Sequence, residues 1–202
     1  DGIYVASPYA LQTDFLDLER IEVLRGPQGT LFGQNSTGGA MNVVTQAPST
    51  DGTYGSADLT LGDHGLTKLR AAINKPLNDK MAMRASFISN KRHGFTDNLT
   101  TGQDLDDADS ISARVRVKYE PSEDFRANFT AQYFDEDRNG SAQKGLLDPT
   151  PDARELRQNS LTEHKLDAQL YSAVLEWDYE TFSVKSLTSY QVDDILVRRD
   201  ND

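Results

Sequence analysis

The stretch LERIEVLRGPQGTLFGQNSTGGAMNVVTQAP, residues 18–48, decides the fold. It contains two short apolar runs, residues 21–24 and 40–44, and each has the length and composition of a β-strand. Several glycines and a proline lie between the runs, and these residue types mark turns rather than the interiors of strands. The stretch therefore predicts two short strands with a glycine-rich connection, and the region ends at Pro48.

From about residue 53 onward, apolar and polar residues alternate along the chain. Successive side chains of a strand point to opposite faces, so each alternating segment has one apolar and one polar face. The pattern predicts an antiparallel sheet, but it fits both a soluble sheet and a membrane β-barrel. The seven candidate strands are residues 57–61, 68–73, 81–87, 113–119, 125–133, 171–177 and 182–190.

The connections between these strands alternate in length. Short turns are expected at residues 76–80, 120–124 and 180–181, and long loops at residues 93–110 and 137–166. Short turns at one rim and long loops at the other are typical of outer-membrane barrels, and the short connection 62–65 is an exception. Aromatic residues near predicted strand ends give weaker support, because soluble sheets share this feature: Tyr119, Tyr133, Phe134, Trp177, Tyr179 and Phe182.

Composition excludes several classes of protein. The chain has 202 residues, of which 37% are hydrophobic, and no segment approaches the length of apolar residues that a transmembrane helix needs. A formal charge of −11 argues against a general nucleic-acid binder, which needs a basic surface. Because cysteine is absent, disulfides and thiolate metal sites are excluded. The residues that follow Asp1 do not resemble a targeting signal.

Residues 18–48 closely resemble the C-terminal half of the plug domain of TonB-dependent receptors. The resemblance rests on RIEVLRGP at 20–27, LFG at 31–33 and GGAMNVVT at 38–45, where Met41 and Val43 stand in place of the usual isoleucines. The segment DGIYV at 1–5 is similar to the strand that precedes this motif in the family. The resemblance implies a mainly β protein, in which part of a small α+β plug domain precedes a partial transmembrane antiparallel β-barrel.

Under this resemblance, residues 1–48 form the C-terminal part of the plug, and residues 49–202 form the first strands of the barrel. The implied function is energised uptake of a scarce ligand across the outer membrane, most often a ferric siderophore and sometimes cobalamin, haem or a glycan. The implied partners are outer-membrane lipid and the TonB complex, which acts through a TonB box expected upstream of Asp1. We expect the chain to be a piece of a longer protein, without a cofactor and without enzymatic activity.

The plug motif supplies the candidate site residues. Its glycines suit tight turns and positive φ. Glu22 and Arg25 are expected on the polar face of a strand, and the resemblance implies that Arg25, together with Arg20, pairs with barrel carboxylates beyond residue 202. The alternative interpretation is a solvated charged strand. The full set is Arg20, Glu22, Arg25, Gly26, Pro27, Gly33, Gly38, Gly39 and Asn42.

Other motifs are weaker. The glycine-rich stretch lacks the Gly-Lys-Ser/Thr ending of a phosphate loop. Residues 135–140 match the opening of an EF-hand loop, but its twelfth position is Leu146 rather than glutamate. The acidic residues of 104–109 fit a solvated loop, and no nucleophile motif is evident. Two alternatives to a transporter stay open at this point, namely a soluble β-sandwich adhesion module and a carbohydrate-acting enzyme that uses loop carboxylates.

Overall fold

The computed structural model describes residues 1–4, 16–29 and 38–200. Strand β1 (Leu18–Arg25) pairs antiparallel with β2 (Gly39–Thr45), so that Ile21 lies opposite Val43. Both strands predicted from the motif are therefore confirmed, and together they form a two-stranded sheet that we call the hairpin. The segment predicted as a strand at residues 1–5 is not one in its described part, residues 1–4. The Asp1 carboxylate instead accepts hydrogen bonds from the backbone N–H and the hydroxyl of Thr45.

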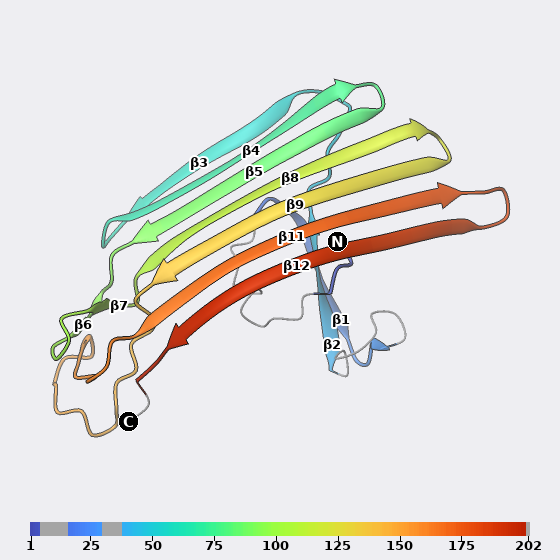
Figure 1. The fold of residues 1–202 in the computed structure, drawn as a ribbon. Helices are drawn as coiled ribbons and strands as arrows, with labels where there is room; N and C mark the ends of the chain where they lie inside the picture. Colours follow the sequence, from blue (N-terminus) through green and yellow to red (C-terminus); the bar gives the residue numbers. More distant parts are fainter. Residues whose placement is uncertain (5–15, 30–37, 201–202) are drawn as a thin grey trace.

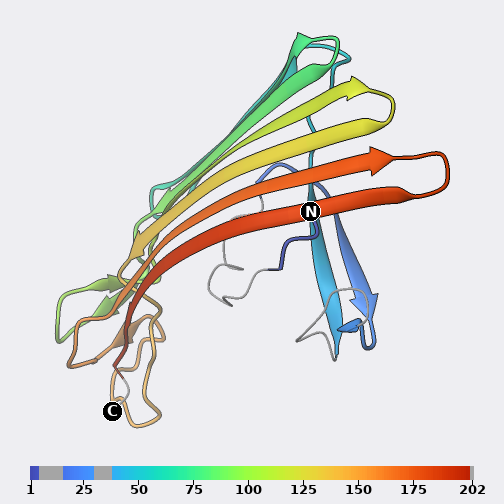
Figure 2. The ribbon, with the colours of Figure 1, turned by 45° about the vertical axis from the view of Figure 1, so that its right-hand side comes forward.

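The seven alternating segments form one antiparallel sheet, in which each strand pairs with its neighbours in sequence. The order is β12-β11-β9-β8-β5-β4-β3, and the sheet curves with the hairpin on its concave side (Figures 1 and 2). The β-sandwich alternative is wrong, because its strands would form two facing sheets. The strands are β3 (Tyr54–Gly62), β4 (Leu66–Asn78), β5 (Met81–Arg92), β8 (Ala108–Ser122), β9 (Phe125–Arg138), β11 (Glu163–Asp178) and β12 (Ser183–Arg198).

The strands are longer than the alternation predicted. Strand β8 begins at Ala108 and β11 begins at Glu163, within segments that were predicted as loops. Polar residues occupy both faces there, so the alternation disappears although backbone pairing continues. Short connections remain at residues 79–80, 123–124 and 179–182, and long ones at 93–107 and 139–162. The predicted asymmetry between the two ends of the sheet is confirmed.

The two long loops are tied together by a second small sheet. It contains β6 (Thr96–Asn98), β7 (Asp104–Leu105) and β10 (Glu155–Leu156), and β10 joins β6 in parallel. The Phe95 ring contacts two guanidinium groups, and its centroid is 4.8 Å from Cζ of Arg92 and 5.2 Å from Cζ of Arg154. The acidic cluster takes part in this linkage, because Asp106 accepts a hydrogen bond from the Ala142 N–H. The long loops therefore form an ordered cap at one end of the sheet.

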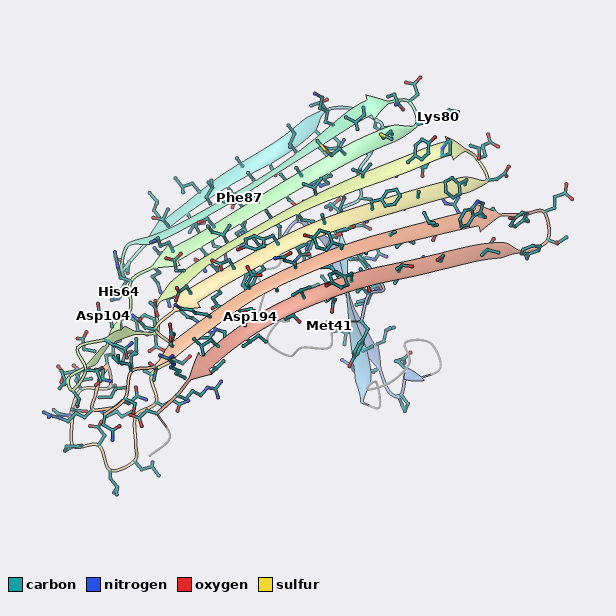
Figure 3. The ribbon with its side chains drawn as sticks, viewed as in Figure 1. Met41, His64, Lys80, Phe87, Asp104 and Asp194 are labelled. Atoms are coloured by element: carbon teal, nitrogen blue, oxygen red, sulfur yellow. The ribbon has the colours of Figure 1, made fainter. Side chains whose placement is uncertain are left out.

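The faces of the seven-stranded sheet differ in chemistry. The face away from the hairpin is apolar and partly exposed, and Phe87 on β5 belongs to it (Figure 3). At the short-turn end, Phe125 packs on Trp177 with ring centroids 4.7 Å apart. Phe134 was predicted near a strand end with the other aromatics, but it is 2% exposed and packs against Leu166 on the hairpin's side. Other exposed residues of the apolar face are Leu59, Leu61, Leu69, Ile73, Ile111, Val115, Tyr119, Phe129, Tyr133 and Tyr171.

Within the described ranges, no helix has the length and apolar character needed to span a membrane.

The close packing of Gly94 against β7, within the 93–107 loop, generates a testable prediction. A Cβ atom at this position would lie 2.6 Å from the backbone of Asp104 and of Leu105, so Gly94→Ala must displace β7. We expect limited proteolysis of the full-length protein to cleave the 139–162 loop faster in this variant. Gly145→Ala, where a Cβ meets nothing within 4 Å, is the control and should leave the cleavage rate unchanged. Equal rates in both variants would show that the packing of Gly94 against β7 does not support the position of the 139–162 loop.

Candidate functional site

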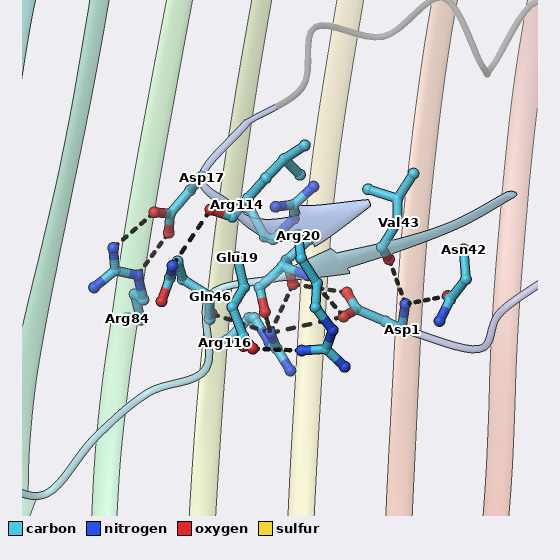
Figure 4. A network of polar contacts seen from close by, with 12 residues as sticks. Asp1, Asp17, Glu19, Arg20, Asn42, Val43, Gln46, Arg84, Arg114 and Arg116 are labelled. Atoms are coloured by element: carbon cyan, nitrogen blue, oxygen red, sulfur yellow. Dashed lines mark hydrogen bonds and ion pairs between the residues drawn. The ribbon is translucent and has the colours of Figure 1, made fainter. Parts of the chain in front are cut away.

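Three arginines on two neighbouring strands face the hairpin. Arg84 on β5 lies directly opposite Arg116 on β8, and Arg114 lies two residues before Arg116 on the same face. Arg84 and Arg114 are each 8% exposed. A buried guanidinium is costly unless charged or polar groups surround it, so these side chains require partners close by. The partners are residues next to the start of β1 and at the end of β2, as Figure 4 shows.

The ion pair between Arg84 and Asp17 is the strongest of these contacts. Nε of Arg84 donates to one carboxylate oxygen of Asp17 and Nη2 donates to the other, each over 2.6 Å. The two side chains are only 9% and 12% exposed. Two parallel charge-assisted hydrogen bonds fix orientation as well as distance. Asp17 directly precedes β1, and its carbonyl accepts a hydrogen bond from Gln46 after β2, so the pair holds the open end of the hairpin.

Arg114 and Arg116 hold backbone carbonyls of the same region. Nη1 of Arg114 donates to the Leu16 carbonyl over 2.6 Å. Nη1 of Arg116 contacts the Thr45 carbonyl at 2.8 Å and the Gln46 carbonyl at 3.0 Å. Leu16 and Gln46 lie just outside the hairpin's ladder and Thr45 is its last residue, so these carbonyls need partners from elsewhere. The hairpin is thus attached to the sheet at its open end, through residues before the start of β1 and at the end of β2.

Asn74 fixes the segment that leads from the hairpin into the sheet. It lies on β4, is fully buried, and accepts a hydrogen bond from the Ser49 N–H over 2.9 Å. Its amide nitrogen donates to the carbonyls of Ser49 and Gly52, each over 2.8 Å. All three contacts go to backbone groups that precede β3. The path between the hairpin and the first strand of the sheet is therefore set by one side chain.

The polar motif residues on the hairpin interact mainly with each other. Arg20 forms ion pairs with Glu19 and Glu22 on its own strand, and Asn42 donates to Glu22 over 2.8 Å from the paired strand. The hydrogen bonds from Asn42 and Arg20 lower the pKa of the Glu22 carboxyl below its ordinary value. Arg25 ends β1 opposite Gly39, and its carbonyl accepts a hydrogen bond from Gln28. The pairing of Arg20 and Arg25 with barrel carboxylates beyond residue 202 stays a prediction.

The motif glycines differ in their backbone conformation and in the space around them. Gly26 has φ +82° and Gly39 has φ +143°, which confirms the expectation of positive φ at both positions. Gly26 and Pro27 follow the end of β1, where the chain bends. The expectation of positive φ is wrong for Gly38, which lies in open space with a backbone that other residues can adopt. Gly33 lies outside the described residues.

Sequence reasoning missed the residues that attach the hairpin, namely Asp17, Asn74, Arg84, Arg114 and Arg116. A signal was present, since Arg114 and Arg116 occupy the polar face of a predicted strand, where a guanidinium needs an acceptor. Their acceptors lie close to the hairpin at distant positions in the sequence, and no local pattern identifies them.

Known proteins resemble this chain in sequence and in fold. Residues 1–40 match the family model described as TonB-dependent receptor plug domain. The chain is 27% identical over 108 residues to the ferric enterobactin receptor PirA of Pseudomonas aeruginosa, which is 50% of this chain and 14% of that protein. It is 46% identical over 48 residues to the pesticin receptor of Yersinia enterocolitica, which is 24% of this chain and 7% of that receptor.

Solved structures show the same fold over most of the chain. The ferric yersiniabactin uptake receptor FyuA from Yersinia pestis superposes with a TM-score of 0.81 at 20% identity, covering 90% of this chain and 29% of that one. The ferripyoverdine receptor of the outer membrane of Pseudomonas aeruginosa gives 0.76 at 19% identity, covering 90% and 24%. The chain thus spans under a third of these receptors.

The chain is similar to TonB-dependent receptors in its plug-domain motif and in its fold. This family comprises receptors and transporters of the bacterial outer membrane rather than enzymes. The seven-stranded sheet is accordingly a partial transmembrane antiparallel β-barrel, with its apolar face toward lipid and its polar face toward the lumen. Arg84, Arg114 and Arg116 belong to the lumenal face.

The ion pair between Arg84 and Asp17 generates a double-mutant prediction. Removing one partner leaves an uncompensated buried charge, which costs about 3–5 kcal/mol. In the full-length protein, Arg84→Gln or Asp17→Asn should speed amide hydrogen exchange in residues 18–25 and 39–45, and the double variant should cost less than the sum of the two. Lys91→Gln breaks the exposed pair with Asp109 and should change exchange little. Strict additivity of the two single variants would show that the pair does not hold the hairpin.

Gly39 provides a second prediction, with its neighbour as the control. A Cβ at Gly39 would lie 2.5 Å from the Leu24 carbonyl oxygen, and its φ of +143° disfavours other residues. Gly39→Ala should cost about 1–3 kcal/mol or more locally. Amide exchange in the hairpin should then accelerate by about tenfold or more. Gly38→Ala, in open space, should exchange like the wild type, and an equal effect of both substitutions would contradict the assignment.

Proposed function

We propose that this chain is part of an outer-membrane receptor that imports a ferric siderophore, with energy supplied by the TonB complex. The observation that carries the proposal is the attachment of the hairpin to the lumenal face through Asp17 and Arg84. A domain bound across the inside of a barrel obstructs free diffusion, so passage of a ligand requires its displacement or rearrangement. The outer membrane has no nucleotide supply, so this step draws its energy from a partner.

The names of the relatives support iron as the cargo. One relative is a ferric enterobactin receptor, and two of the structures are a ferric yersiniabactin uptake receptor and a ferripyoverdine receptor. Two of these receptors share this fold, and the third is similar in sequence over half of this chain. An iron chelate is therefore the ligand class that we assign to the present receptor.

The domain assignment is part of the same proposal. Residues 1–48 form the C-terminal part of the plug, and residues 49–202 contribute the first strands of the barrel. Within the plug, the contacts among Arg20, Glu22 and Asn42 stiffen the hairpin. The remaining motif residues have structural and gating roles that rest on the family resemblance alone: Arg25, Gly26, Pro27, Gly33, Gly38 and Gly39. The long loops face the cell exterior and the short turns face the periplasm, as is usual in outer-membrane barrels.

The test is uptake of radioactive iron by cells that carry or lack the full-length receptor. Ferric complexes of catecholate, hydroxamate and carboxylate chelators are supplied separately under iron limitation. We expect deletion of the receptor gene to abolish uptake of one class, and deletion of TonB to have the same effect. Re-expression of the wild type or of Lys91→Gln, which alters an exposed pair, should restore uptake.

Two outcomes would contradict the proposal. Uptake that persists without TonB would remove the energised mechanism. Dependence of cobalamin, haem or glycan uptake on the gene, with iron uptake unchanged, would retain a receptor but overturn the assignment of its ligand.

A further inference from the structure

One row of lumenal residues contacts both the hairpin and the segment that leads from it into the sheet. Tyr54 on β3 lies opposite Asn74 on β4, and Asn74 lies opposite Arg84 on β5. Arg116 on β8 continues the row beyond Arg84. Residues directly opposite each other share one face of a sheet, so all four side chains lie on the face toward the hairpin. Neighbouring members of the row thus hold different parts of the chain.

The segment after β2 changes its attachment from the hairpin to the sheet. The Gln46 N–H donates to the Asp17 carbonyl over 3.0 Å, and the Gln46 side chain donates to the Leu18 carbonyl over 3.3 Å. Three residues later, the N–H and the carbonyl of Ser49 both bond to the side chain of Asn74, over 2.9 Å and 2.8 Å. The change of attachment therefore falls within the two residues between Gln46 and Ser49.

These two residues, Ala47 and Pro48, form a short joint. Ala47 is exposed and Pro48 is fully buried. Proline has a fixed φ and no N–H, and it restricts the residue before it to extended conformations. The three steps from Gln46 to Ser49 span at most about 11 Å when the chain is extended. A force that displaces the hairpin therefore reaches Ser49 with little slack.

The side chain of Asn74 can resist such a force. An amide side chain has one acceptor oxygen and two N–H donors, and here it bonds three backbone groups, of which the third is the Gly52 carbonyl at 2.8 Å. The side chain is fully buried, so its removal would leave these groups without partners. Strand β3 begins at Tyr54, just beyond this contact. Without the contact, a pull on Ser49 would load the first pair of the ladder between β3 and β4 and open the ladder from its end.

We propose that Asn74 is the positioning residue at which movement of the plug ends, so that the hairpin leaves the lumenal face during transport while residues 49–52 and β3 stay in place. The inference rests on the proposed function, which supplies the displacement of the plug. The contacts of Arg84 and Arg116 with the hairpin lie on the moving side of the joint, and the contacts of Asn74 lie on the fixed side. Arg84 keeps one neighbour on the fixed side, because its Cζ lies 5.7 Å from the centroid of the Tyr54 ring.

The first experiment locates the boundary in the full-length receptor with Asn74 intact. The 202 residues contain no cysteine, so one reporter thiol is introduced at a time, and any cysteine elsewhere in the receptor is replaced by serine. Val44→Cys lies on the hairpin and Thr50→Cys lies in the segment held by Asn74, and both positions are half-buried. Reaction with N-ethylmaleimide is followed in cells that have or lack TonB, supplied with catecholate, hydroxamate and carboxylate complexes of iron.

We expect TonB to accelerate the reaction of the Val44→Cys reporter by about tenfold or more, because the hairpin is displaced. The Thr50→Cys reporter should react at the same rate in both strains, because its segment stays on the sheet. Equal acceleration at both positions, or acceleration at neither, would overturn the proposal.

The second experiment tests Asn74 itself. The reporter is Ala57→Cys on the lipid-facing side of β3, where a thiol stays protonated and reacts slowly unless the strand opens. In the Asn74→Ala background, TonB should accelerate this reaction by about fivefold or more, whereas a purely structural loss would raise the rate equally with and without TonB. The control is Asn78→Ala, an exposed asparagine at the end of the same strand, and its rate should not depend on TonB.

The outcomes separate this proposal from the proposed function. A labelling rate in the Asn74→Ala background that does not depend on TonB would reject the role of Asn74. If iron uptake by the wild type still requires TonB, the proposed function stays intact after that result. The expected labelling pattern without any iron uptake would retain the role of Asn74 and reject iron as the cargo.

Discussion

The structure depends on how buried positive charge on the lumenal face is satisfied. Arg84, Arg114 and Arg116 lie side by side on β5 and β8, where water is largely excluded. In a soluble protein such side chains would turn to solvent, but here one face of the sheet is committed to lipid and the other to the lumen. The hairpin supplies one carboxylate and several carbonyl oxygens to the arginines. The same contacts therefore give the buried arginines their hydrogen-bond acceptors and position the plug.

This arrangement requires the alternation along the strands. A shift of one residue in the register of β8 would turn Arg114 and Arg116 toward lipid and Val115 toward the lumen. Burial of two guanidiniums in hydrocarbon is far more costly than any gain from the shifted pairs. The polar contacts of the plug and the apolar outer face thus select the same register, which explains how a sheet without a large core can have one defined pairing.

Local sequence patterns predicted much of the fold but little of the candidate site. The period-two alternation located all seven strands, and the motif at residues 18–48 located the two strands of the hairpin. The ends of β8 and β11 were missed, because Asp109, Ser110 and His164 continue the backbone ladder without any apolar signal. The attachment was missed for a different reason. Arg84 and Asp17 are 67 positions apart, and only the packing of the hairpin against the sheet brings them together.

The position of the attachments has a consequence for movement of the plug. They meet the hairpin at Leu16 and Asp17 before β1, and at Thr45 and Gln46 at the end of β2. These two places are adjacent because the strands are antiparallel. Each contact on one end is thus supported by contacts on the other, since Asp17 also accepts a hydrogen bond from Gln46. Loss of one contact leaves the rest in place, so release of the hairpin needs several charge-assisted bonds to break together. The charged face of the sheet therefore holds both chain ends of the hairpin as one unit.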